Sequence, residues 1–211
     1  MRLFKPDPKD HWERVYKKNA STEVGWYQAY PERSLKLIND TGVGTDGSII
    51  DIGGGTSTLA GHLLDKGYRQ ITVFDLSGNA IEKAKSQLGE KSGRINWIEA
   101  DVTKYSFMKQ YDIWHDRAVF HFLTEAEDRE GYKNSLNHAL RLNGHLIIST
   151  FSPDAPPKCS GLPVVRYSQE ALENELGNNF TMVDSFAEDH LTPSGIKQNF
   201  MFCRFIKRFK A

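Results

Sequence analysis

The segment that most constrains the fold is a hydrophobic run ending in an acidic residue and three consecutive glycines, at residues 49–55. Such a run predicts a buried strand and a tight turn, and a helix is predicted to begin directly afterwards. Glycine is needed in this turn because a side chain would forbid some backbone dihedral angles and hold a ligand away from the backbone. The segment therefore predicts a nucleoside site in an α/β fold.

A second acidic residue follows at the spacing expected for ribose binding. Residues 71–75 form another predicted strand, which ends at Asp75, about 20 residues after the glycines. A carboxylate at this position reaches both ribose hydroxyls in nucleotide-binding βαβ units. Together with Asp51 at the end of the first strand, this pattern favours S-adenosylmethionine as the ligand.

Nicotinamide and flavin cofactors are the competing interpretation, because their sites also combine glycines with a ribose-binding acid. Those sites carry a third small residue where the helix packs on the strand, whereas this chain has Thr58 there. Asp51 also precedes the glycines, and no pyrophosphate site is evident. A glycine-rich turn without any ligand is the simpler alternative for the turn alone, but the order of the surrounding acids argues against it.

Composition limits the partners of the chain. Its 211 residues contain 27 lysines and arginines and 27 aspartates and glutamates, so no overall charge attracts nucleic acid or an anionic membrane. No apolar run approaches the ~20 residues that span a bilayer. We therefore expect a protein or small-molecule partner, without nucleic acid or membrane, and no feature predicts an oligomeric state.

The compartment and the metal content are predicted from cysteine and histidine. Only two cysteines are present, which is too few for a disulfide framework, and the N-terminus lacks the apolar core of a signal peptide. The seven histidines do not have the paired spacing of zinc ligands. The sequence predicts a cytoplasmic protein without a metal.

Predicted strands and helices alternate along the chain, which is typical of a mostly parallel sheet covered on both faces. We expect one domain, with residues 1–46 as a helical N-terminal segment that forms a lid and residues 47–211 as the main domain. After the first two strands, further strands are predicted at 95–100, 111–117, 144–151, 180–186 and 199–206, the last two as an antiparallel hairpin.

The acid-glycine turn and the seven predicted strands with their terminal hairpin resemble the class I S-adenosylmethionine-dependent methyltransferases. The segment 11–16, His-Trp-Glu-Arg-Val-Tyr, and the pair Trp26-Tyr27 are similar to the group that contains the citrate synthase and elongation factor lysine methyltransferases. The resemblance implies a Rossmann-like sheet with strand order 3-2-1-4-5-7-6 and helices on both faces. It also implies S-adenosylhomocysteine as the product.

The resemblance further assigns roles to the strand ends. Asp51 and the glycines would hold the methionine part of the cofactor, and Asp75 the ribose. An acid after the third strand would accept a hydrogen bond from adenine. The simpler alternatives are that these acids only face solvent and that Asp101 caps a helix. For Leu76, which would cover the adenine, the alternative is a position in the core. The implied cofactor residues in these strand ends are Asp51, Gly53, Gly54, Gly55, Asp75, Leu76, Asp101 and Val102.

Aromatic residues near the N-terminus could cover the cofactor. Trp12 and Tyr16 share a helical face, and Trp26 lies in a predicted loop. A ring near the sulfonium would also provide a cation–π contact. We predict that these three residues belong to a lid over the cofactor; packing of an amphipathic helix is the alternative for the first two.

Catalytic candidates follow the fourth strand. Methyl transfer from a sulfonium is an in-line displacement, so the enzyme mainly aligns the nucleophile, excludes water and leaves the nucleophile unprotonated. Asp116 is the preferred catalytic residue, with His121 second; strand alternation allows only one of His115 and Asp116 to point inward. The alternatives are an Asp116–Arg117 ion pair and a packing role for His121.

The sequence thus predicts a methyltransferase acting on a protein lysine or a small molecule. The segment after the fourth strand, residues 116–119, lacks the Asn/Asp-Pro-Pro-aromatic pattern of enzymes that methylate adenine or amide nitrogens. A catalytically silent protein that binds S-adenosylmethionine or S-adenosylhomocysteine as a partner or sensor is the alternative, because it could keep the same residues.

Overall fold

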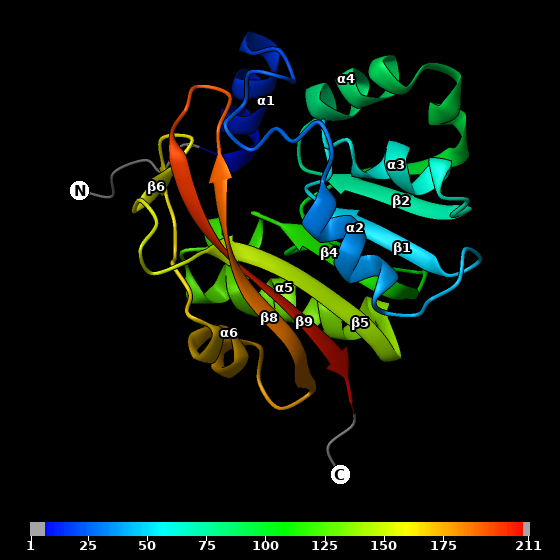
Figure 1. Ribbon diagram of the computed structural model, residues 1–211, viewed down its shortest axis with the longest axis vertical. Coiled ribbons are helices and arrows are strands. Elements are labelled where there is room, and N and C mark those ends of the chain that lie inside the picture. Colours follow the sequence, from blue (N-terminus) through cyan, green and yellow to red (C-terminus); the bar gives the residue numbers. More distant parts are fainter. Residues whose placement is uncertain (1–6, 209–211) are drawn as a thin grey trace.

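Five strands run parallel through the centre of the computed structural model, which describes residues 7–208 (Figure 1). The C-terminal hairpin extends this sheet in the antiparallel direction, with β9 pairing with β5 and β8 pairing with β9. The strands are β1 (Ser48–Ile52), β2 (Gln70–Asp75), β3 (Ile95–Glu99), β4 (Tyr111–Arg117), β5 (Leu140–Phe151), β8 (Phe180–Leu191) and β9 (Lys197–Lys207).

The sheet has the order β3-β2-β1-β4-β5-β9-β8. Counted within this sheet alone, that is 3-2-1-4-5-7-6; the labels differ because β6 (Lys158–Cys159) and β7 (Leu162–Pro163) form a separate two-stranded ribbon. The predicted Rossmann-like methyltransferase fold is confirmed.

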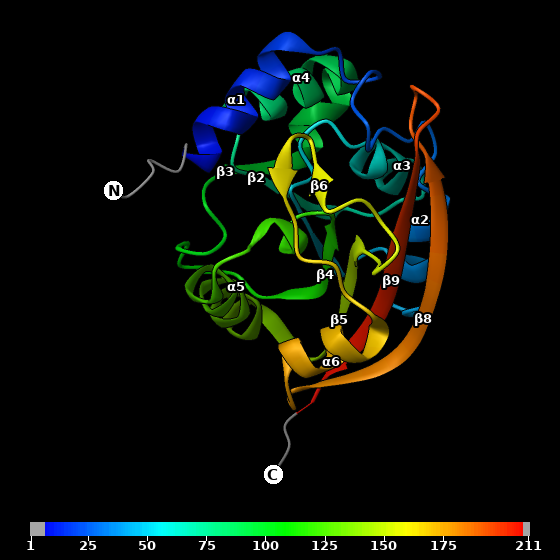
Figure 2. The same cartoon turned by 90° about the vertical axis from the view of Figure 1, so that its left-hand side faces the viewer.

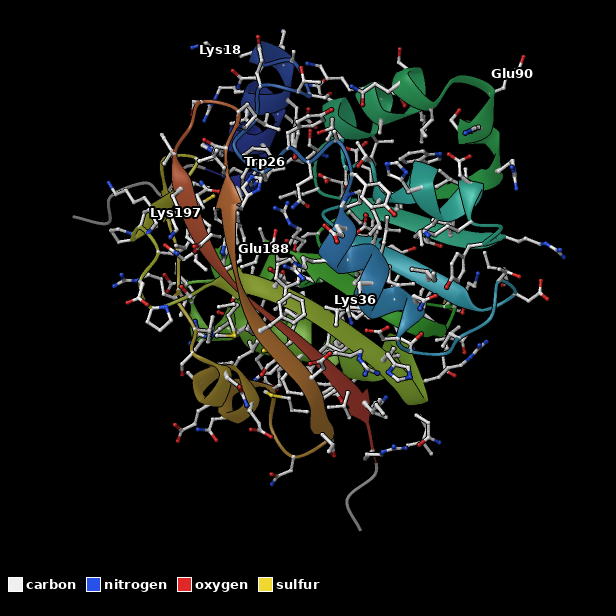
Figure 3. All side chains as sticks on the ribbon, in the orientation of Figure 1. Lys18, Trp26, Lys36, Glu90, Glu188 and Lys197 are labelled. Atoms are coloured by element: carbon white, nitrogen blue, oxygen red, sulfur yellow. The ribbon has the colours of Figure 1, made fainter. Side chains whose placement is uncertain are left out.

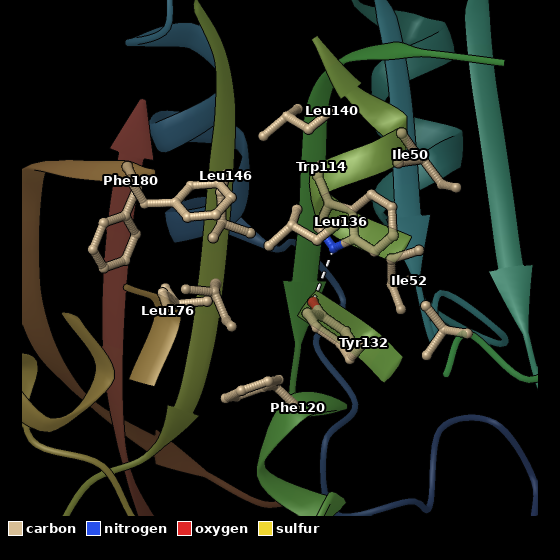
Figure 4. Close-up of a cluster of buried hydrophobic side chains, with 14 of the residues drawn as sticks. Ile50, Ile52, Trp114, Phe120, Tyr132, Leu136, Leu140, Leu146, Leu176 and Phe180 are labelled. Atoms are coloured by element: carbon tan, nitrogen blue, oxygen red, sulfur yellow. Dashed lines mark hydrogen bonds between the residues drawn. The ribbon is translucent and has the colours of Figure 1, made fainter. Parts of the chain in front are cut away.

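Helices cover both faces of the sheet, with α5 and α2 on opposite sides (Figure 2). Alternation along β4 divides its side chains between two cores: Trp114 packs with α5 and Ile113 packs with α2 and α3. In the α5 core, Trp114 donates a hydrogen bond from Nε1 to the Tyr132 hydroxyl at 2.9 Å (Figure 4). The helices are α1 (Pro8–Lys18), α2 (Glu32–Asn39), α3 (Leu59–Asp65), α4 (Gly78–Leu88), α5 (Ala126–Ala139) and α6 (Gln169–Leu176), with short 3-10 helices η1 (Gly89–Arg94) and η2 (Phe120–Phe122).

The C-terminal hairpin is longer than the sequence predicts. Its strands continue to Leu191 and from Lys197, past the end of the β5 pairing at Phe151. Polar residues in the extension are held by the N-terminal segment, since His190 Nε2 lies 2.8 Å from the Gly25 carbonyl oxygen. The hairpin and residues 25–28 thereby form one wall beside the carboxyl ends of the parallel strands.

Helix α1 packs against α4 (Figure 1). The Glu13 carboxylate accepts a hydrogen bond from the Gly78 amide at 2.7 Å, at the N-terminus of α4, and Lys9 forms an ion pair with Glu99 at 2.6 Å. Residues 1–6 of the predicted N-terminal segment lie outside the described residues. Within 7–208, no helix has the length and apolar character needed to cross a membrane.

Candidate functional site

The glycine turn joins β1 to α3 and is packed tightly on three sides. Gly53 has a φ of +65°, and a Cβ there would lie 2.1 Å from Val119 Cγ2. A Cβ at Gly54 would lie 2.6 Å from Asp51 Oδ2, and one at Gly55 the same distance from a carboxylate oxygen of Asp75. Side chains are therefore excluded from the turn, as the sequence predicts.

Asp51 begins a chain of hydrogen bonds that crosses from β1 to α2. Its Oδ1 lies 2.7 Å from His115 Nδ1, and His115 Nε2 lies 2.8 Å from Ser34 Oγ. All three side chains are buried. Parallel pairing places Asp51 opposite His115, on the α2 face of the sheet. In the tautomer with the hydrogen on Nδ1, the ring donates a hydrogen bond to the Asp51 carboxylate and accepts one from the Ser34 hydroxyl.

The second oxygen of Asp51 has no partner. Oδ2 is buried and makes no hydrogen bond within residues 7–208. It lies against the glycine turn, as the contact with Gly54 shows. A buried carboxylate oxygen normally has a donor, so this atom fits a ligand with an N–H or O–H group.

Asp75 lies at the end of β2 and is also buried. Its Oδ1 accepts a hydrogen bond from the Ser77 amide at 2.8 Å. Burial raises the pKa of Asp75 to about 7, and the nearby charge of Asp51 acts in the same direction. Hydroxyl donors from a ribose would stabilise the ionised form, so this carboxylate also fits the predicted ligand.

A cavity of about 40 Å³ lies on the α2 face, at the carboxyl ends of β1 and β4. This is room for a few water molecules. Residues 26–34 close it from the N-terminal side, and Figure 3 shows Trp26 between α1 and the end of β8. The residues that carry its chemistry are Trp26, Ser34, Asp51, Gly54, His115 and Arg117.

Comparison with known proteins agrees with this geometry. Residues 49–144, which contain the glycine turn, both acids and β4, match the family model described as "Methyltransferase domain". The chain is 27% identical over 147 residues to malonyl-[acyl-carrier protein] O-methyltransferase 2 of Ilyobacter polytropus, covering 67% of this chain and 54% of that protein. The chain thus spans about half the length of this relative.

A human relative and a solved structure cover more of the chain. EEF1A lysine methyltransferase 2 of Homo sapiens is 23% identical over 192 residues, covering 83% of this chain and 75% of that protein. N-methyltransferase NodS from Bradyrhizobium japonicum WM9, solved with S-adenosylhomocysteine, superposes with a TM-score of 0.70 at 18% identity, covering 95% and 99% of the two chains. The chain is thus similar in sequence to methyltransferases and shares the fold of the S-adenosylhomocysteine-bound NodS structure.

The preferred catalytic candidate, Asp116, does not face the cavity. It is buried on the α5 face, where it accepts hydrogen bonds from the Val119 amide at 2.8 Å, the Phe120 amide at 3.1 Å and the Tyr132 hydroxyl at 2.6 Å. Burial raises its pKa to about 6. Among the described residues it forms no ion pair with Arg117. The neighbouring His115 is the residue that points into the cavity.

His121, the second catalytic candidate, is also placed in the core. Its ring lies against Phe122 and Phe151, with centroids 4.4 and 4.8 Å away, and its Nδ1 accepts a hydrogen bond from the Phe151 amide at 3.2 Å. Burial lowers its pKa to about 3. Its Nε2 is buried without a hydrogen-bond partner among the described residues, and the ring does not line the cavity. This placement favours the packing alternative.

Asp101 is occupied by its own turn after β3. Its Oδ1 accepts hydrogen bonds from the Thr103 amide at 2.9 Å and the Thr103 hydroxyl at 2.7 Å, and Lys104 lies 3.2 Å from Oδ2. This is the capping arrangement weighed against the adenine role. Val102 is buried in the α5 core and Leu76 is partly buried. The structure does not bring these three residues to the cavity.

The three predicted lid aromatics do form one cluster. The Trp12 ring lies 5.6 Å from that of Trp26 and 6.2 Å from that of Tyr16, and it also contacts Phe122 at 5.0 Å. Only Trp26 lines the cavity; Trp12 and Tyr16 support it from α1. Ser34 and Arg117 also line the cavity. The sequence offered no signal for Ser34, because a serine inside a helix has no distinctive pattern.

Proposed function

We propose that this chain transfers the methyl group of S-adenosylmethionine to a nucleophile on a small molecule or a protein lysine. The observation that carries the proposal is the Asp51 carboxylate. One of its oxygens lies 2.7 Å from His115 Nδ1, and the other is buried against the glycine turn without a partner among the described residues. Names of relatives support both acceptor classes, since one is a malonyl-[acyl-carrier protein] O-methyltransferase and another an EEF1A lysine methyltransferase. A silent binding protein is less favoured, because the cavity also contains a base.

The residues that would hold the cofactor are those at the strand ends. Asp51 would accept from the amino group of the methionine part beside the glycine turn, and Asp75 would accept from the ribose hydroxyls. The adenine would lie toward Leu76 and the Asp101–Val102 segment, which requires Asp101 to share its carboxylate with the ligand. The bound sulfonium makes the methyl group electrophilic.

His115 is the proton acceptor that the geometry supports best, in place of Asp116 and His121. The acceptor nucleophile would attack the methyl carbon as the carbon–sulfur bond breaks, and sulfur would keep the bonding pair. The nucleophile would lose its proton to Ser34 Oγ as the serine gives its own proton to His115 Nε2. Asp51 would then stabilise the imidazolium, 2.7 Å away.

Residues 1–46 would act as a lid. The cavity has a volume of about 40 Å³, which holds only a few waters, so the cofactor must displace part of its wall on entry. The N-terminal wall is held by discrete polar contacts: Glu13 to α4 and the Gly25 carbonyl to His190. Contacts of this kind can break and re-form, unlike the packed core of the sheet.

A cytoplasmic location and an acceptor that is not a nucleic acid belong to the same proposal. Cys159 and Cys203 are both free and buried, as suits a reducing compartment, and the charges of the chain balance. Fractionation of cells that produce the protein tests the location.

Calorimetric titration with S-adenosylmethionine and S-adenosylhomocysteine tests the cofactor site. We expect micromolar binding to the wild-type protein and loss of at least 100-fold in affinity in Asp75→Ala, since the ribose would face an empty, dry site. Asp65→Ala is the matched control, because Asp65 is an exposed acid at the end of α3. Absence of binding by folded wild-type protein refutes the proposal, and methyl transfer to a lysine peptide or a malonyl thioester then separates the acceptor classes.

A further inference from the structure

Arg117 is the last residue of β4 and lines the cavity. Its Nη1 donates a hydrogen bond to the Trp26 carbonyl oxygen at 2.8 Å, and its guanidinium carbon lies 5.1 Å from the centre of the Phe200 ring. These contacts fix the plane of the guanidinium from two directions. Nε and Nη2 are shielded from solvent and have no hydrogen-bond partner within residues 7–208.

The two unpartnered nitrogens form one edge of the guanidinium. The N–H groups of Nε and Nη2 point in parallel, at the spacing of the two oxygens of a carboxylate. Bidentate pairing at this edge is the strongest contact that an arginine makes with a planar anion. Trp26 and Phe200 therefore hold the guanidinium so that this edge makes no hydrogen bond within the described residues.

No neighbouring acid fills this role. The Glu188 carboxylate accepts from Gln28 Nε2 at 3.3 Å and lies 3.6 Å from Arg33, while its Oε2 has no hydrogen-bond partner among the described residues. Its charge also acts on Arg117, but from beyond ion-pair distance. Asp51 pairs with His115. Figure 3 shows Glu188 on β8, below Trp26. In the part of the chain that the structure describes, no carboxylate lies within ion-pair distance of Arg117. Burial lowers the pKa of Arg117 to about 10, and the group still remains charged at neutral pH.

We infer that Arg117 binds a carboxylate group of a ligand in this cavity. A carboxylate is favoured over a phosphate because the cavity is small and because Asp51 already places a negative charge in it. The carboxylate could belong to the methionine part of the cofactor or to the methyl acceptor. In either case the inference rests on the proposed function. It extends that function by naming the chemical group that Arg117 recognises.

Calorimetry on full-length Arg117→Gln and Arg117→Lys distinguishes the two sources. S-adenosylhomocysteine carries the carboxylate, whereas 5′-methylthioadenosine has the same nucleoside without it. If the methionine part is the source, Arg117→Gln weakens S-adenosylhomocysteine at least tenfold and leaves methylthioadenosine within twofold. Arg117→Lys keeps the charge without the fork and should lie between the two proteins.

Titration with acetate tests whether the methyl acceptor carries the carboxylate. The readout is the Nε–H resonance of Arg117 in proton–nitrogen correlation spectra. This resonance is assigned by its loss in Arg117→Lys. If the acceptor supplies the carboxylate, acetate shifts the resonance in protein saturated with S-adenosylhomocysteine, whose own affinity does not depend on Arg117. Inorganic phosphate, as the comparison anion, should shift it less at equal concentration.

Arg33→Gln is the control, since it removes a positive charge next to Ser34 and Glu188 but outside the cavity lining. It should leave both nucleoside affinities within twofold. The inference is overturned if S-adenosylhomocysteine affinity is the same in Arg117→Gln and acetate leaves the Nε–H resonance unmoved, or if phosphate is the stronger anion. Failure of both nucleosides to bind wild-type protein would instead refute the proposed function, while acetate on the ligand-free protein would still test Arg117.

Discussion

Asp51 and Asp116 end neighbouring parallel strands, and their surroundings differ completely. Asp51 faces α2, keeps one buried oxygen without a partner and lies beside the cavity. Asp116 faces α5 and accepts three hydrogen bonds from its own turn and from Tyr132. The fold leaves one oxygen of Asp51 without a hydrogen-bond donor, whereas it supplies donors to both oxygens of Asp116. Burial alone therefore does not identify a functional acid; the unfilled hydrogen-bonding capacity does.

Asp116 also contributes to the site indirectly, by holding the turn that follows β4. Asp116 holds the Val119 and Phe120 amides after Ala118, whose φ of +71° is unusual for a residue other than glycine. This turn places Val119 directly against Gly53. Asp116 is thus a positioning residue for the glycine turn, while Asp51 is available to the ligand.

Asparagine substitutions at the two acids should show this difference most strongly. Asp116→Asn replaces an oxygen that accepts hydrogen bonds by an amide that donates, and leaves buried donors unpaired. We expect a loss of about 3 kcal/mol in the free energy of unfolding. Asp51→Asn should cost about 1 kcal/mol but weaken S-adenosylhomocysteine more than tenfold. Urea denaturation and calorimetry measure the two effects, and equal losses of stability would contradict the comparison.

Gly53→Ala tests the contact between the two regions. Alanine would adopt a φ of +65° and place its Cβ against Val119, so we expect a loss of about 2 kcal/mol in stability and weaker cofactor binding. Gly42→Ala is the matched control, since Gly42 has a φ of +72° but open space around its Cβ. It should cost about 1 kcal/mol and leave binding unchanged. A smaller loss of stability at Gly53 than at Gly42 would show that Val119 moves aside at little cost.

A buried carboxylate that binds a ligand should destabilise the ligand-free protein when it is ionised. The variant Asp75→Asn tests this effect. The folded-state pKa of Asp75 is about 7, above its value near 3.8 in the unfolded chain, so the folded state binds more protons between these values. The stability that Asp75 contributes is therefore lost as pH rises from about 4 to about 7. We expect Asp75→Asn to be more stable than wild type by about 1 kcal/mol at pH 8, with little difference at pH 4, and to lose cofactor binding. Thermal unfolding across pH measures this; a destabilised variant at pH 8 would refute it.

The placement of two buried acids beside the glycine turn could be predicted from the sequence because these parts are local. Asp51, the glycines and Asp75 lie within one strand-turn-helix-strand unit, and each occupies a strand end that periodicity defines. Backbone conformation alone places them, so no distant contact was needed. The same reasoning predicted the parallel sheet and its terminal hairpin.

The acceptor half could not be predicted in this way. Alternation requires His115 and Asp116 to face opposite sides, but it does not say which side holds the cavity. That depends on where α2 and α5 pack. Ser34 and the Trp26 carbonyl reach His115 and Arg117 across 81 and 91 residues of sequence, a proximity that exists only in the folded sheet.

Tyr132→Phe sharpens the comparison with a smaller change on the Asp116 side. The hydroxyl donates to Asp116 and accepts from Trp114, so its removal takes away one of three donors to the carboxylate and leaves the indole N–H unpaired. We expect a loss of about 1 kcal/mol in stability. Because the hydrogen bond from Tyr132 favours the ionised form, its removal should also move the Asp116 pKa further above its present value of about 6. Carboxyl carbon chemical shifts followed across pH report this pKa directly. Cofactor affinity should stay within twofold at neutral pH, because Asp116 would still hold the Val119 and Phe120 amides. A large loss of affinity without a change in the Asp116 pKa would place Asp116 among the residues that contact the ligand, and would remove the distinction between the two acids.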